Sequence, residues 1–252
     1  MRAILLAAGQ GTRLRPLTDE RPKALVEVGG QAMLARARES LAAAGVADLT
    51  VVTGYRADRI RELGYDTRQN EEFATTNMVW SLFCADDVLE ACAAEGRDLL
   101  IIYGDVLFHP DLVRALSAAP ATPATVVNTS FRELWERRMD DPLCDLETLR
   151  IDAEGRILEL GEKPSGFEDI EAQYTGLIRV GARDIARVRE IWSDRRLTEP
   201  EAARSLYMTR FLTHLFQRGL DLWSVPFAGG WMEVDAPEDI PVAEAMLAEL
   251  EE

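Results

Sequence analysis

Residues 5–14 read Leu-Leu-Ala-Ala-Gly-Gln-Gly-Thr-Arg-Leu, an apolar run followed by a short loop with two glycines. The run predicts a buried strand, and the loop predicts a tight connection to the next element. Glycine also lets backbone N–H groups approach a phosphate closely, because no side chain stands in the way. The stretch matches neither the P-loop pattern nor the dinucleotide fingerprint. Tight turns use glycine for conformational reasons alone, so these residues leave phosphate binding open.

Outward from this stretch, β-rich runs alternate with segments of helical periodicity. The alternation predicts an α/β, Rossmann-like fold with a mixed, mostly parallel central sheet flanked by helices. Strands are expected at residues 3–8, 49–53, 99–103, 125–128, 174–180 and 222–226, with a hairpin at 149–160. Helices are expected at residues 33–44, 78–93, 111–118, 182–192, 199–218 and 237–251.

Length and composition indicate one folding unit over residues 1–252, because 47% hydrophobic residues suffice for one substantial core. We expect a cytoplasmic protein, since the chain shows neither a long apolar run nor a signal-peptide pattern. The net charge of −16 opposes general attraction to nucleic acid or anionic membranes. The three cysteines have no C-x-x-C spacing and suggest neither disulfides nor a zinc site.

Lysine is used in only two places, Lys23 and Lys163, among 28 basic residues. Both lie beside a proline, in Arg21-Pro22-Lys23 and Glu162-Lys163-Pro164. A compact ammonium differs from a guanidinium fork where one point charge must contact phosphate oxygens. The alternative is chance survival of two surface lysines. Positive charge is also concentrated between Arg13 and Lys23, as an anionic ligand requires.

Two aspartates are candidate metal ligands. Asp105 directly follows the apolar run 99–103, so it is expected at the carboxyl end of a central strand, where ligands of open α/β sheets bind. Asp235 follows a short strand that begins at Trp231. Carboxylates together with phosphate oxygens suit Mg²⁺. A turn residue and a helix N-cap are the plain alternatives for the two positions.

The order of these motifs resembles the nucleotidyltransferase superfamily of sugar-phosphate pyrophosphorylases and related cytidylyltransferases. The resemblance spans nearly the whole chain and rests on residues 6–14, Pro22-Lys23, Gly104-Asp105, Glu162-Lys163-Pro164 and Val234-Asp235. Residues 75–82 resemble the Asn-containing segment of bacterial phosphocholine cytidylyltransferase-like proteins. Sugar-1-phosphate uridylyl- and thymidylyltransferases usually show a Gln-rich segment there, so the resemblance implies CTP.

The acceptor implied by the resemblance is a small phosphorylated molecule of phosphoglutamine, phosphocholine or aminoethylphosphonate type. Residues 131–135, 171–177 and 206–211 are most similar to a subgroup that includes enzymes acting on phosphorylated glutamine. A choline site needs aromatic residues and a carboxylate. Thr209-Arg210 stands where an acidic residue is expected near Tyr207, which favours an acceptor with a carboxylate or amide.

The resemblance also implies residue roles. Arg13, Lys23 and Lys163 are the expected catalytic cations, and Asp105 with Asp235 would hold Mg²⁺. The residues expected to bind the nucleotide are Leu6, Ala7, Ala8, Gly9, Gly11, Thr12, Asn77, Ser81 and Asp105. Those expected to contact the acceptor are Trp135, Lys163, Tyr174, Tyr207, Arg210, Trp231 and Glu233, although aromatic residues at such positions often serve packing alone.

The implied reaction is in-line attack by a phosphate or phosphonate oxygen of the acceptor on the α-phosphorus of CTP, with pyrophosphate leaving. Two alternatives stay open. One is a sugar-1-phosphate uridylyl- or thymidylyltransferase of the same fold. The other is a noncatalytic nucleotide-binding regulatory domain, against which the presence of both lysines and both aspartates argues. We expect no nucleic-acid or membrane partner, and a homodimer is the assembly considered.

Overall fold

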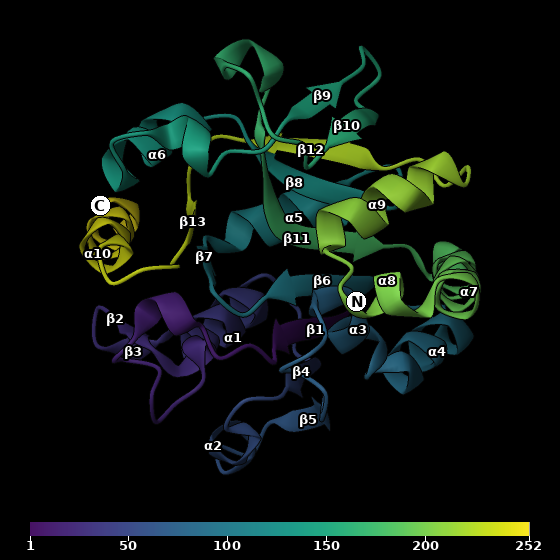
Figure 1. Cartoon of the computed structure of the whole chain (residues 1–252), viewed down its shortest axis with the longest axis horizontal. Coiled ribbons are helices and arrows are strands. Elements are labelled where there is room, and N and C mark those ends of the chain that lie inside the picture. Colours follow the sequence, from purple (N-terminus) through teal and green to yellow (C-terminus); the bar gives the residue numbers. More distant parts are fainter. Residues whose placement is uncertain (252) are drawn as a thin grey trace.

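A seven-stranded sheet lies at the centre of the computed structural model, which describes residues 1–251 (Figure 1). The strand order is β12-β8-β11-β6-β1-β4-β5. Strand β11 pairs antiparallel with both β6 and β8, whereas the other pairs of this sheet are parallel. The strands are β1 (Arg2–Ala7), β4 (Leu49–Thr53), β5 (Asp66–Gln69), β6 (Leu99–Tyr103), β8 (Ala124–Asn128), β11 (Gln173–Val180) and β12 (Trp223–Phe227). The predicted mixed, mostly parallel α/β sheet is confirmed.

Both faces of the sheet are covered, which explains why its central strands are continuous apolar runs. In β1, Ala3 and Leu5 belong to one hydrophobic cluster, and Ile4 between them belongs to the other. Figure 1 shows α6 and α10 on one side of the sheet and α4 and α7 on the other. The first cluster packs against α1 (Met33–Ala43), α5 (Pro110–Ala118), α6 (Phe131–Arg138) and α10 (Asp239–Glu251). The second packs against α3 (Met78–Phe83), α4 (Asp86–Glu95), α7 (Ala182–Thr198), α8 (Pro200–Arg204) and α9 (Met208–Gln217).

Small antiparallel pairs lie outside the main sheet. Strands β9 (Leu149–Ile151) and β10 (Ile157–Leu160) form the predicted hairpin. Strands β7 (Val106–Phe108) and β13 (Trp231–Glu233) pair across more than 120 residues of chain, and β2 (Glu27–Val28) pairs with β3 (Gln31–Ala32). The β7–β13 pair brings the segment after β13 beside the turn after β6.

The single helix predicted over residues 78–93 was wrong, because the structure divides it into α3 and α4. Ala85 leaves the helical conformation at φ −106° and ψ 32°. Asp86 and Asp87 then begin α4, and they form ion pairs with Arg189 and Arg68 respectively at 2.7 Å. Leu82, Ala85, Leu89 and Cys92 are nevertheless all buried.

The helix predicted over residues 199–218 was also wrong, since it is divided into α8 and α9. Tyr207 is extended, at φ −74° and ψ 154°. The backbone carbonyl of Arg204 accepts a hydrogen bond from Asn77 N at 2.8 Å, and that of Ser205 accepts from Asn77 Nδ2 at 3.5 Å. This tertiary contact uses carbonyls that a continuous helix would have paired internally.

The prediction missed α2 (Ala57–Arg61), α6 and the polar strand β5 at the edge of the sheet. No helix within residues 1–251 is both long and apolar enough to cross a membrane. The expectation of one folding unit over residues 1–252 stays a prediction.

Candidate active site

Three strand ends meet at one edge of the sheet. Parallel strands β1 and β6 end there, and antiparallel β11 begins there, so Ala8, Asp105 and Tyr174 lie at the same edge. Gly104 N donates to Leu6 O at 2.9 Å. A Cβ on Gly104 would lie 2.6 Å from that oxygen, so only glycine permits this approach of the two strand ends.

The glycine loop after β1 is shaped around Lys23. Gly11 has φ +71°, and a Cβ there would lie 2.8 Å from Cβ of Lys23. A side chain at position 11 would therefore be both strained and in collision with the lysine. A Cβ on Gly9 would have no atom within 4 Å, so the backbone of Gly9 borders open space.

Lys23 is the buried positive charge of the site. Its Nζ lies 2.7 Å from Asp105 Oδ2 and 2.5 Å from Asp235 Oδ1, and its side chain is 13% exposed. Burial opposes the charge, but the two carboxylates outweigh it and raise the pKa of Lys23. The lysine is therefore charged throughout the neutral range.

The β7–β13 pair explains how Asp235, 130 residues beyond Asp105, reaches the same ammonium. The backbone N–H of Val234 donates to Asp105 O at 3.0 Å, continuing the pairing one step further. Asp235 Oδ2 also lies 3.0 Å from Nη2 of Arg13. Burial would raise the pKa of Asp235, but Lys23 and then Arg13 lower it.

Neighbouring donors and positive charges do not fully compensate two acidic groups of the site, Asp105 and Glu233. Asp105 Oδ1 is buried and accepts no hydrogen bond from the part of the chain that is described. Glu233 has its pKa raised to about 8 by burial and by the nearby Asp235 carboxylate, against the opposing effect of Arg138. Asp105 therefore keeps one unused carboxylate oxygen next to the buried ammonium of Lys23.

The first pocket at this edge is bounded by the strand ends on one side and by α3 on the other. Among the predicted nucleotide-binding residues, its lining includes Leu6, Ala8, Gly9, Asn77, Ser81 and Asp105. Asn77 caps α3, with Oδ1 accepting from Met78 N at 2.8 Å, and Ser81 Oγ accepts from Asn70 Nδ2 at 2.9 Å. As far as residues 1–251 define it, this lining does not include Ala7, Gly11 or Thr12.

A second pocket adjoins the first, and both are lined by Met78, Tyr103 and Asp105. Of the predicted residues, Arg13, Trp135, Tyr174, Tyr207, Glu233 and Asp235 also line it. Tyr174 donates its hydroxyl to Tyr103 at 3.1 Å. Tyr207 is 61% exposed and lies at the break between α8 and α9.

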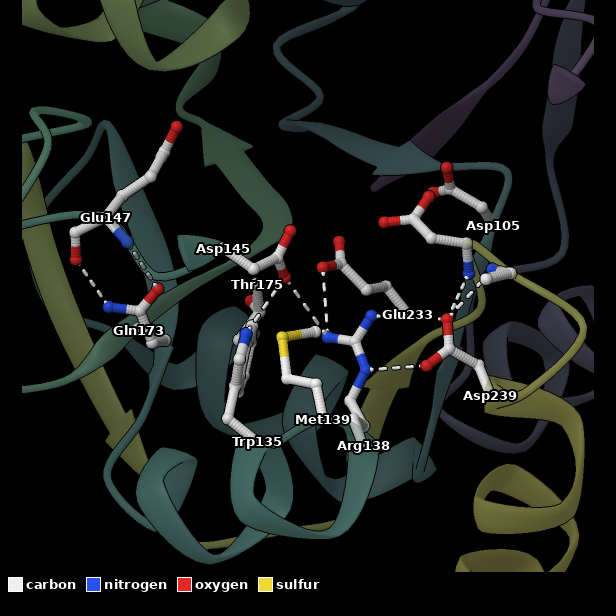
Figure 2. Close-up of polar contacts among 12 residues, drawn as sticks. Asp105, Trp135, Arg138, Met139, Asp145, Glu147, Gln173, Thr175, Glu233 and Asp239 are labelled. Carbon is white, nitrogen blue, oxygen red and sulfur yellow. Dashed lines mark hydrogen bonds and ion pairs between the residues drawn. The ribbon is translucent and has the colours of Figure 1, made fainter. Parts of the chain in front are cut away.

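The lining of this second pocket also includes Asp145, Glu147, Gln173 and Thr209, four polar residues that sequence reasoning did not assign to the site. Figure 2 shows Asp145 and Glu233 turned toward Arg138, with Glu147 beside Gln173. Gln173 Nε2 donates to the backbone carbonyl oxygen of Glu147 at 2.6 Å, so this hydrogen bond does not involve the Glu147 carboxylate. Burial raises the pKa of Glu147. Arg210 opposes this effect, whereas the acidic groups of Asp145 and Glu162 add to it. The segment 139–148 has no periodic pattern that could have indicated Asp145 or Glu147.

Three predicted acceptor residues lie elsewhere. Lys163 donates to Leu143 O on an exposed loop, and Arg210 forms a bidentate ion pair with Glu162. Trp231 is 2% exposed, donates to Thr175 O at 2.8 Å and stacks on Trp135. In the described chain, neither pocket is lined by these three residues. Trp231 thus has the packing role that was the alternative for the aromatic positions.

Comparison with known proteins shows the family of the chain. The family model of the MobA-like NTP transferase domain matches residues 3–197. A CTP:phosphoglutamine cytidylyltransferase of Campylobacter jejuni is 36% identical over 96% of this chain and 98% of its own length. A 2-aminoethylphosphonate cytidylyltransferase of Lancefieldella rimae is 35% identical over 43% of this chain and 46% of its own length.

A solved structure has the same fold. The CTP:phosphocholine cytidylyltransferase of Streptococcus pneumoniae superposes with a TM-score of 0.71 over 98% of both chains, at 22% identity. Because the matching family model covers well over half of the sequence and one relative aligns along nearly its whole length, the chain belongs to the family of MobA-like NTP transferase domains.

Proposed function

We propose that this nucleotidyltransferase transfers CMP from CTP to a small phosphorylated acceptor and releases pyrophosphate. The main observation in support is that two pockets meet at Asp105 and Tyr103, directly beside the buried ammonium of Lys23. A nucleotide in the first pocket and an acceptor in the second would bring their phosphates together at this point. Cytidylyltransferase relatives support CTP as the donor.

The reaction needs positioning and charge neutralisation more than a base, because the attacking phosphate or phosphonate oxygen is already anionic. That oxygen forms a bond to the α-phosphorus of CTP while the bond to the pyrophosphate oxygen breaks. Lys23 would neutralise charge on the α-phosphate, and Arg13 would contact the triphosphate from the open side. Gly9 and Gly11 would let the backbone approach that triphosphate.

We further propose Mg²⁺ as the cofactor, held by Asp105 and Asp235. The residues fit it, since both carboxylates converge on one cation and Asp105 Oδ1 is a buried oxygen without a partner in the described residues. No cluster of three or more His, Cys, Asp or Glu side chains suited to a metal occurs within residues 1–251. Two carboxylates suit magnesium, which usually takes its other ligands from phosphates and water. The chemistry that bound Mg²⁺ supplies is neutralisation of the triphosphate.

The second pocket, which we call the acceptor pocket, has the composition that an ammonium group requires. Asp145 and Glu147 supply acidic oxygens, and Trp135, Tyr174 and Tyr207 supply aromatic surface. We therefore propose an acceptor with a positively charged nitrogen at the end opposite its phosphate. The acidic residue that the sequence lacked near Tyr207 is replaced here by Asp145 and Glu147, which come from another part of the chain. Choline is thus less disfavoured than the sequence indicated.

Lys163 lines neither pocket in the described part of the chain. Its predicted contact with the acceptor phosphate stays a prediction, which requires the ammonium to leave Leu143 O. We also propose that the protein acts in the cytoplasm. Homodimer formation stays a prediction that size-exclusion chromatography with light scattering would test.

A pyrophosphate-release screen tests the proposed function. CTP, UTP, dTTP and GTP are each combined with phosphoglutamine, phosphocholine, 2-aminoethylphosphonate and glucose-1-phosphate, with Mg²⁺ present. We expect release with CTP and at least one of the three nitrogen-containing acceptors. Release only with UTP or dTTP and the sugar phosphate would instead identify a sugar nucleotidyltransferase. Nucleotide-dependent thermal stabilisation without any release would identify a noncatalytic binding domain.

A further inference from the structure

Arg138 is a buried guanidinium next to the candidate active site. It is the last residue of α6, its side chain is 1% exposed, and its guanidinium carbon lies 5.0 Å from the ring centroid of Trp135. A buried charge is costly unless it is paired and hydrogen-bonded. The carboxylates that pair with Arg138 therefore indicate what this residue does.

The first contact is with Asp239 at the start of α10. Arg138 Nε donates to Asp239 Oδ1 at 2.9 Å, and Nη2 donates to Asp239 Oδ2 at 3.3 Å. Asp239 Oδ2 in turn accepts from the backbone N–H groups of Asp235 at 2.7 Å and Ala236 at 3.0 Å. Figure 2 shows the carboxylate of Asp239 turned toward the guanidinium of Arg138. Arg138 thus orients the carboxylate that fixes the backbone of Asp235.

The second contact is with the acceptor pocket. Arg138 Nη1 lies 3.3 Å from Glu233 Oε1 and 3.7 Å from Asp145 Oδ2. Asp145 Oδ2 also accepts from Trp135 Nε1 at 2.9 Å. Glu233 and Asp145 both line the acceptor pocket, whereas Arg138 itself is behind them. The same guanidinium therefore contacts two carboxylates of the acceptor pocket and, in Asp239, the carboxylate that holds the backbone of Asp235.

We propose that Arg138 is a positioning residue that sets Asp235 through Asp239 and, with its other nitrogen, holds Asp145 and Glu233 at the acceptor pocket. The proposal rests on the proposed function, because it concerns how the nucleotide side and the acceptor side of one reaction centre are kept in register. Arg138 touches neither substrate in this arrangement. Its effect on Lys23 and Arg13 is transmitted through the carboxylate of Asp235.

A merely stabilising role makes a different prediction. If Arg138 only stabilises the packing of α6 on α10, its loss should lower the melting temperature and leave the kinetic constants of the folded enzyme unchanged. A positioning role predicts that the folded variant has a lower kcat and a higher acceptor KM than the wild type. The neighbouring Arg137 provides the matched control, because it pairs with Glu249 on the same two helices and is 35% exposed.

The experiment compares Arg138→Met, Asp239→Ala, the double variant and Arg137→Met in the full chain, with CTP, Mg²⁺ and the acceptor identified by the screen. We expect Asp239→Ala to lower kcat about 10- to 100-fold, the usual range for loss of a group that orients a ligand. The acceptor KM of this variant should stay within about twofold of the wild-type value. Arg138→Met should lower kcat similarly and also raise the acceptor KM at least about fivefold, because only Arg138 contacts both sets of carboxylates. Arg137→Met should leave both constants unchanged.

The double variant tests the order of the contacts. If Arg138 acts on Asp235 through Asp239, the kcat of the double variant should equal that of Arg138→Met within about twofold. Multiplied losses would contradict transmission through Asp239. Arg138→Lys, which keeps a buried positive charge but not the guanidinium fork, replaces Arg138→Met if the latter does not fold.

Crystal structures of wild type and Asp239→Ala supply a readout that requires no activity. We expect Asp235 within hydrogen-bond distance of Lys23 Nζ in the wild type and beyond it in the variant. Unchanged kinetic constants in folded Arg138 and Asp239 variants of an active enzyme, or an unchanged Asp235–Lys23 contact in the variant crystal, would overturn the inference. An inactive wild type would instead contradict the proposed function, and the crystal comparison alone would then decide the positioning role.

Discussion

Nζ of Lys23 lies 2.7 Å from Oδ2 of Asp105, although 82 residues separate them in the chain. The contact joins the loop after β1 to the turn after β6 at the carboxyl edge of the sheet. Asp235 completes the group from the segment after β13. Three distant parts of the sequence thus contribute one cation and two carboxylates to the point where the two pockets meet.

Replacing Lys23 by Met should lower kcat about 100- to 1000-fold, the range observed when one preorganised electrostatic contact to a transition state is lost. Met keeps much of the volume and removes the charge beside Asp105 and Asp235. Steady-state pyrophosphate release measures the effect, and circular dichroism checks that the variant is folded. Arg21→Met is the control, since Arg21 is 49% exposed and pairs weakly with Glu27 at 3.8 Å. A folded Lys23→Met enzyme with near wild-type turnover would remove the proposed role of this lysine.

Gly11→Ala should reduce both stability and activity. Alanine at φ +71° is strained by about 1 to 2 kcal/mol, and its Cβ would also collide with Lys23. Gly64 has φ +79° with no atom within 4 Å of a Cβ, so Gly64→Ala has the strain without the collision. Urea unfolding should show a larger loss of stability in Gly11→Ala than in Gly64→Ala, and turnover should fall only in Gly11→Ala. Equal turnover in the two variants would mean that the loop does not position Lys23.

Glu147→Gln should raise the KM for a nitrogen-containing acceptor about 5- to 10-fold and leave the KM for CTP unchanged. The substitution keeps the shape of the side chain and removes the acidic oxygen that we propose faces the ammonium. Glu154→Gln on the β9–β10 hairpin is the control, because that side chain is 67% exposed and distant in the fold. A selective change in the CTP constant would place Glu147 in the wrong site.

Asp98 should make stability depend on pH in the acid range. Burial alone would raise its pKa, but hydrogen bonds from Ala182 N at 2.9 Å and Arg179 Nε at 2.8 Å outweigh burial and lower the pKa from its ordinary value. A carboxyl with a lowered folded-state pKa stabilises the protein above its unfolded-state pKa and loses that contribution as pH falls through the folded value. The stability difference between wild type and Asp98→Asn should therefore be greatest near neutral pH and shrink below about pH 4. Urea unfolding at several pH values measures it, and a difference that grows toward low pH would contradict the assignment.

The sequence predicted the central sheet well, because strands such as 99–103 are buried on both faces and are therefore uniformly apolar. It also placed Asp105 and Asp235 at strand ends, because each aspartate follows a run that predicts a strand. Helix breaks at Ala85 and Tyr207 escaped prediction, since they depend on tertiary contacts with Arg68, Arg189 and Asn77 rather than on local periodicity.

The candidate site was predicted where it follows strands and was missed where it follows irregular chain. Lys23 was found through the scarcity of lysine, whereas Asp145 and Glu147 lie in a segment without a pattern. Arg138 and Asp239 are 101 residues apart, and each looks like an ordinary surface charge in the sequence. Only the packing of α6 against α10 shows that they meet.

The most direct test of the account is a crystal structure of the protein with CTP and Mg²⁺. We predict the triphosphate along the backbone of Gly9 and Gly11, with the α-phosphate in contact with Lys23 Nζ and the metal bound by Asp105 and Asp235. A triphosphate bound away from this loop, with Lys23 still enclosed by the two carboxylates, would contradict the central claim.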